Sequence, residues 1–74
     1  MAKARVTEIT PLQERMVAYI RESIADRGEA PTLAEIGAHF GMRSRASVHY
    51  HLDRCEKLGA IVRDHGRSRG IRLP

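Results

Sequence analysis

Apolar residues recur at a helical spacing in the first third of the chain and predict one amphipathic helix. They are Leu12, Met16, Val17, Ile20 and Ile24. Thr10 can cap this helix, Pro11 suits its first position, and Gln13 completes a capping box with the threonine. Gly28 supplies the left-handed residue that commonly ends a helix. We therefore predict a helix between Thr10 and Gly28, preceded by a flexible N-terminal arm at residues 1–9.

Two further apolar patterns follow within a few residues of each other. Thr32 and Glu35 form a second capping-box pair, and Gly41 ends the short helix that they begin. The apolar positions of this helix are Leu33, Ile36 and Phe40. Either Ser44 or Ser47 can start the next helix, which has a regular apolar stripe. The stripe consists of Val48, Leu52, Cys55 and Leu58.

The hydrophobic period changes after the third helix. Residues 60–63 include consecutive β-branched side chains, and residues 70–73 alternate in polarity, which is typical of short strands. The polar segment 64–68 between them contains a glycine and favours a turn. The order of helix, short helix, tight turn, helix and β-hairpin predicts a mostly α-helical domain over residues 10–74. Its predicted fold class is the winged helix-turn-helix.

This fold class assigns different roles to the third helix and to the hairpin. The second helix of a helix-turn-helix lies in the major groove of DNA, where base edges are distinguishable. Ser47, His49 and Tyr50 lie off the apolar stripe and offer hydrogen-bonding groups to such edges. His49 and Tyr50 can alternatively pack against the hairpin. The hairpin itself forms a wing that can reach backbone phosphates.

Positive charge is concentrated in the second half of the chain. Residues 1–42 carry five basic and six acidic side chains, whereas residues 43–74 carry eight basic and three acidic ones. This asymmetry predicts a surface that binds a polyanion, the alternative being an ordinary solvated surface. The predicted phosphate contacts lie at the start of the third helix, along it and in the wing. They are Arg43, Arg45, Arg54, Arg67 and Arg69.

Length and composition argue against several other classes of protein. A chain of 74 residues forms one small domain without room for a large catalytic cleft. No apolar run approaches the roughly 20 residues that span a membrane. His51 and Cys55 have the spacing of metal ligands but no second ligand pair, so we expect a packed histidine and a buried thiol. We therefore predict no enzyme activity, no cofactor and no metal site. We also predict a cytoplasmic location, because the single cysteine cannot form an internal disulfide.

Several short motifs along the chain form one combined pattern. They are TPLQER at residues 10–15, APTLAEIG at 30–37, FGMRS at 40–44, SVHYHL at 47–52, KLG at 57–59 and SRGIRL at 68–73. Together they resemble the N-terminal DNA-binding domain of the LexA repressors of the bacterial SOS response. The resemblance extends over about residues 7–73.

The resemblance implies a transcriptional repressor that binds a specific duplex DNA operator. The base contacts that it implies are Ser44, Ala46, Ser47, His49 and Tyr50. LexA proteins continue into a self-cleaving, dimerising protease domain with a Ser–Lys dyad, whereas the only lysines here are Lys3 and Lys57. We therefore expect an isolated DNA-binding domain or a free-standing relative in the bacterial nucleoid, binding half-sites as a monomer or weak homodimer. The alternative function is a winged-helix module that binds another protein.

Overall fold

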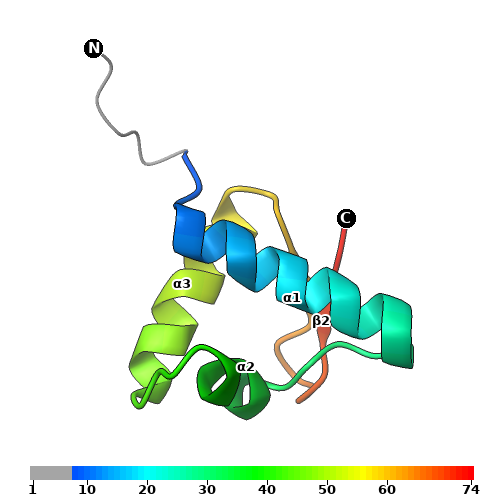
Figure 1. Cartoon of the computed structure of the whole chain (residues 1–74). Coiled ribbons are helices and arrows are strands. Elements are labelled where there is room, and N and C mark those ends of the chain that lie inside the picture. The colour runs from blue at the N-terminus through cyan, green and yellow to red at the C-terminus, as the bar shows by residue number, and fades with distance from the viewer. Residues whose placement is uncertain (1–7) are drawn as a thin grey trace.

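The computed structural model describes residues 8–74 and shows, within them, three helices followed by a two-stranded sheet. The elements are α1 (Pro11–Arg27), α2 (Leu33–His39), α3 (Arg45–Lys57), β1 (Val62–Arg63) and β2 (Ile71–Arg72). In Figure 1, α1 crosses the top of the molecule, α3 lies on the left, α2 at the bottom and β2 on the right. This order confirms the predicted winged helix-turn-helix. Within the described residues, no helix has the length and apolar character needed to cross a membrane.

The first two helices begin at the residues that the capping boxes predict. The Thr10 hydroxyl accepts a hydrogen bond from the Gln13 backbone N–H, and the Gln13 side chain accepts one from the Thr10 N–H, each at 3.1 Å. Thr32 and Glu35 repeat the arrangement at the start of α2. Each pair satisfies backbone groups that the helix itself leaves unpaired.

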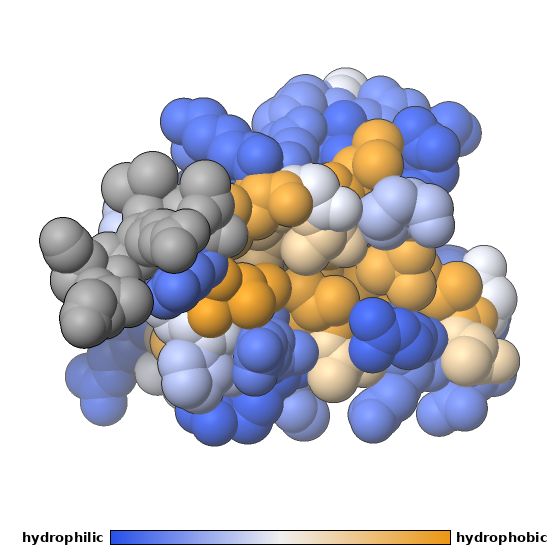
Figure 2. Space-filling view, turned by 90° about the horizontal axis from the view of Figure 1, so that it is seen from above, coloured by the Kyte–Doolittle hydropathy of each residue, from blue (hydrophilic) through white to orange (hydrophobic). Residues whose placement is uncertain are grey.

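The core is built from one face of each helix and from the ends of the hairpin. Its buried hydrophobic residues are Met16, Val17, Ile20, Ala30, Ile36, Val48, Leu52, Cys55, Ile61 and Ile71. Other apolar side chains of the predicted stripes, such as Leu12 and Leu58, are only half-buried. Figure 2, which looks onto α1 from above, shows hydrophobic side chains reaching the surface in a band between polar flanks. A domain this small cannot cover its core completely.

A tight turn sets α3 close against α2. Gly41 has a φ of 69°, a left-handed conformation that side chains disfavour. Just before it, Gly37 is buried, and a Cβ atom at this position would lie 3.3 Å from Cγ2 of Val48. The absence of a side chain at Gly37 therefore allows the two helices to approach. This contact fixes α3, the predicted recognition helix, on the support that α2 provides.

The hairpin differs in length from the prediction. Its strands pair Val62 with Arg72 and Arg63 with Ile71, so each has two residues where the sequence predicts four. Ala60, two residues before β1, donates its backbone N–H to the Cys55 carbonyl at 2.9 Å. This hydrogen bond belongs to the C-terminal end of α3, so Ala60 is not part of the strand.

The predicted N-terminal arm falls mostly outside the described residues, which start at Glu8. Residues 1–7 of that arm belong to the part of the chain that the structure does not describe. Ile9 is half-buried and packs against the core, so the end of the predicted arm contacts the domain.

Candidate nucleic-acid interface

The segment from Arg43 to Tyr50, at the start of α3, is exposed at every position except one. Ser44 is the N-cap, and its hydroxyl accepts a hydrogen bond from the Ala46 N–H at 3.1 Å, which decides the helix start in favour of Ser44 over Ser47. The exposed residues from the turn onward are Arg43, Ser44, Arg45, Ala46, Ser47, His49 and Tyr50. Val48 interrupts the run because it is buried in the core. All five residues predicted to contact bases are therefore brought together on one accessible side of α3.

Tyr50 and His49 occupy the middle of this surface in different ways. Tyr50 is 59% exposed, and the Arg54 guanidinium lies 6.0 Å from the centre of its ring. His49 is exposed and its Nδ1 lies 3.5 Å from Nη2 of Arg63, so α3 meets the first wing strand here. His49 therefore contacts the wing through Arg63 and is still exposed, and Tyr50 is exposed as well.

His51 lies beside this surface, with its ring centre 5.2 Å from that of Tyr50, and connects α3 to α1. The Gln13 carbonyl already accepts a hydrogen bond from Thr10, so its amide group faces His51, with 3.1 Å between Nε2 and Nδ1. Gln13 is buried, with 1% of its surface exposed. The capping residue of α1 therefore also orients α3. Cys55 is buried as predicted, and burial raises the pKa of its thiol.

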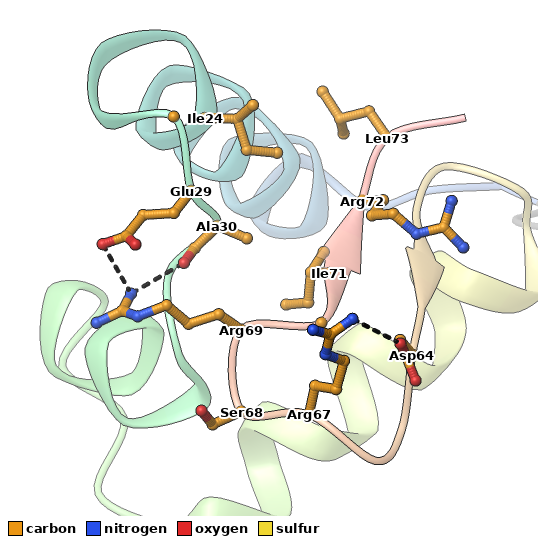
Figure 3. A pocket seen from close by; sticks show the side chains of 12 residues that line it. Ile24, Glu29, Ala30, Asp64, Arg67, Ser68, Arg69, Ile71, Arg72 and Leu73 are labelled. Carbon is orange, nitrogen blue, oxygen red and sulfur yellow. Dashed lines mark hydrogen bonds and ion pairs between the residues drawn. The ribbon is translucent and has the colours of Figure 1, made fainter.

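The wing loop, residues 64–69 between β1 and β2, carries two arginines with different surroundings. Arg67 is exposed, and its Nη1 lies 3.7 Å from Oδ2 of Asp64 within the same loop. The Arg69 side chain instead turns toward the start of α2, where its two terminal nitrogens each lie 3.0 Å from a different oxygen of Glu35. Figure 3 shows Arg67 beside Asp64 and Arg69 directed toward Glu29 and Ala30.

The Arg69 contact changes the ionisation of its partner. Hydrogen bonds from the Arg69 side chain, and then from the Thr32 backbone N–H, lower the pKa of Glu35 from 4.5 to about 2. The hydrogen bond between Arg69 and Glu35 also raises the pKa of Arg69. Both groups therefore remain charged across the physiological range, and the pair is permanently ionic there.

The acidic residues of the second half are paired with their neighbours. Asp53 binds Lys57 at 3.1 Å, Glu56 approaches His65 at 3.2 Å, and Asp64 approaches Arg67 at 3.7 Å. Arg43 and Arg45 form no ion pair with any described residue and are exposed at the α3 N-terminus. The backbone N–H groups of a helix N-terminus attract anions, so these two arginines extend an existing positive end.

Sequence reasoning did not single out three residues that shape this surface. The sequence places Arg63 in the basic half and in the predicted strand 60–63, but it does not predict that Arg63 lies beside His49. Gln13 and Glu35 were identified only as capping residues, yet each also contacts a distant element. The signal for Arg63 was its place in the first wing strand, next to the recognition helix. No local signal predicts the second role of the two capping residues.

Comparison with known proteins gives one consistent family. The family described as LexA DNA binding domain matches residues 6–70. A LexA repressor of Sorangium cellulosum is 45% identical over 64 residues, which cover 86% of this chain and 28% of that protein. A LexA repressor of Thiobacillus denitrificans is 46% identical over 67 residues, covering 90% of this chain and 34% of the relative. The chain thus spans about a third of the length of the curated relatives that it matches.

Proposed function

Because the chain belongs to the LexA DNA-binding domain family, we propose that it binds a specific sequence in duplex DNA as the operator-binding part of a transcriptional repressor. In this proposal α3 lies in the major groove and the wing follows the backbone. The observation that carries it is the single exposed side of α3, which combines hydrogen-bonding side chains with a basic N-terminus.

Base recognition falls to the exposed residues at the start and middle of α3. Ala46 and Ser47 are small and allow the helix to approach the base edges closely. His49 and Tyr50 project further and supply ring nitrogen and hydroxyl groups for hydrogen bonds. The set proposed for base contacts is Ser44, Ala46, Ser47, His49 and Tyr50. Ser44 can donate its hydroxyl proton to DNA while its oxygen continues to cap α3.

Backbone contacts fall to arginines that surround this surface. Arg43 and Arg45 are placed at the α3 N-terminus, Arg54 lies one turn beyond Tyr50, and Arg67 projects from the wing. Such contacts release condensed counterions from the duplex and position the protein without reading its sequence. Arg69 is also predicted to contact phosphate, but Glu35 holds its guanidinium on the α2 side of the wing.

The domain by itself presents one recognition helix and therefore fits one half-site. Its affinity for a half-site is expected to be modest, and linking two such domains on adjacent half-sites raises the overall affinity. For any longer protein that contains this domain, we propose the dimeric repressor arrangement and self-cleavage of the LexA family. Its place of action would be the bacterial nucleoid.

Selection from random DNA tests this function directly. The chain is incubated with duplexes that contain a randomised central segment, and the retained fragments are sequenced over successive rounds. A short recurrent motif is expected, because base contacts of this kind each discriminate by about 1–3 kcal/mol. Retention of duplexes without any enriched motif would show that the domain only binds the backbone, and no retention at all would contradict DNA binding.

A further inference from the structure

The wing loop is attached to the helix-turn-helix by one strong ionic contact. Arg69 places Nη1 and Nη2 each 3.0 Å from an oxygen of Glu35, and Nη1 also donates to the Ala30 carbonyl at 2.9 Å. Glu29 lies 3.8 Å from the same nitrogen. Two parallel hydrogen bonds between a guanidinium and a carboxylate fix the relative orientation of both groups. We call the contact between Arg69, Glu35 and the Ala30 carbonyl the wing clasp.

Glu35 is itself held in place by the start of α2. Its Oε1 accepts a hydrogen bond from the Thr32 backbone N–H at 3.0 Å as part of the capping box. On the other side, Arg27 donates to the Ser23 hydroxyl at 2.6 Å, and this hydroxyl donates to the Glu29 carbonyl at 3.0 Å. The connector between α1 and α2 is therefore also fixed. The wing clasp joins the loop to a rigid part of the domain.

Hydrophobic packing does little to hold the same loop. Residues 64–69 are all exposed, and the backbone bonds at Asp64 stay within the hairpin, to Gly70 and Arg67. A cavity of about 670 Å³ separates the loop from the end of α1, with Ile24 and Leu73 among its walls (Figure 3). On the α3 side the loop is attached through His65 and Glu56 at 3.2 Å, an ion pair only when the histidine is protonated. The position of the loop therefore depends mainly on the clasp.

We infer that Arg69 is a positioning residue, which holds the wing so that Arg67 meets the DNA backbone, and is not itself a phosphate contact. Both terminal nitrogens of its guanidinium are occupied by Glu35, whereas Arg67 two residues earlier is exposed with a 3.7 Å neighbour. This inference rests on the proposed function, because it assigns to the wing a contact with duplex DNA. It adds Glu35 to the residues that determine affinity, although Glu35 carries the same charge as the DNA.

The sign of the Glu35→Gln effect separates the two roles of Arg69. Glutamine preserves the capping box, as Gln13 shows in α1. It removes the carboxylate charge that pairs with Arg69 and that lies 4.0 Å from Arg27, while Glu29 stays 3.8 Å from Arg69. If Arg69 positions the wing, Glu35→Gln weakens binding to the selected duplex by about three- to tenfold, the effect of ordering one or two side chains anew. If Arg69 binds phosphate, the same variant binds more tightly, because it loses a negative charge and frees the arginine.

A charge-conserving variant gives a second, independent readout. Arg69→Lys keeps the charge but cannot form the paired hydrogen bonds, so we expect a loss like that of Glu35→Gln, and little further loss when the two are combined. Arg15→Lys, at an exposed position of α1, makes the same exchange outside the proposed interface and is expected to bind as the unmodified chain does. Glu14→Gln, in the first turn of α1, is the matched control for the change of charge.

All variants are measured by titration of the selected duplex at several salt concentrations, with thermal unfolding recorded for each. Tighter binding by Glu35→Gln, or unchanged binding by Arg69→Lys, would overturn the positioning role while leaving the proposed function intact. Failure of the unmodified chain to bind any duplex would instead remove the proposed function.

Discussion

Glu35 shows how one side chain can serve two elements at once. Its carboxylate closes the cap of α2 and receives the Arg69 guanidinium from the wing. The first role is visible in the sequence, because Thr32 stands three positions earlier. The second is not, because 34 positions separate Glu35 from Arg69 and no local pattern relates them. A capping residue identified from sequence can therefore carry a tertiary contact that only the fold reveals.

The lowered pKa of Glu35 predicts a specific dependence of stability on pH. The carboxyl has a pKa of about 2 in the folded chain, against an ordinary value of 4.5. Between these values the unfolded chain binds more protons than the folded one, so stability rises with pH there. The contribution of the pair is complete above about pH 4.5 and is lost as the pH falls toward 2.

Urea titrations between pH 2 and 7 measure this contribution. The unmodified chain should lose stability more steeply than Glu35→Gln below pH 4.5, and the difference between the two should shrink toward pH 2. Parallel curves for the two proteins over the whole range would contradict the ionic pairing in the folded state.

At the scale of elements, local sequence signals predict where the helices begin. For the wing they predict a hairpin but not the length of its strands. Thr10 and Thr32 begin the first two helices as predicted, because a capping box acts within four consecutive residues. The exposed side of α3 follows from the burial of Val48 and Leu52, which fixes the rotation of the helix. Strand length could not be predicted in the same way, because Ala60 closes α3 instead and pairing begins only at Val62.

The wing as an element makes a prediction about salt. Arg67 is proposed to neutralise one phosphate, so Arg67→Ala should reduce the slope of log affinity against log salt by about 0.9 in magnitude. It should also weaken binding to the selected and scrambled duplexes by similar factors, since a phosphate carries no sequence information. The measurement is a titration of each duplex between low and moderate salt. An unchanged slope would show that Arg67 does not contact the backbone.

At the scale of the whole molecule, the two halves of the chain differ in net charge and in the elements that they build. The first 42 residues carry the weaker charge and build α1 and α2, whereas the remainder carries eight of the 13 basic residues and builds α3 and the wing. From sequence alone, the charge asymmetry predicts that the second half of the chain contacts DNA, and this half builds α3 and the wing. The charge asymmetry does not distinguish Arg67 from Arg69, because the two differ in direction: Arg67 lies beside Asp64 in the loop, whereas Arg69 extends to Glu35.

Reading of base edges by α3 is tested most directly by comparing two variants on two duplexes. Ser47→Ala and His49→Ala remove hydrogen-bonding groups from exposed positions beside the buried Val48. Each should weaken binding to the selected operator by about 1–3 kcal/mol and binding to a scrambled duplex much less, because scrambled DNA presents no matching base edge. Thermal stability should remain nearly unchanged. Equal losses on both duplexes would contradict base reading, and a large loss of stability would show that these side chains pack rather than read.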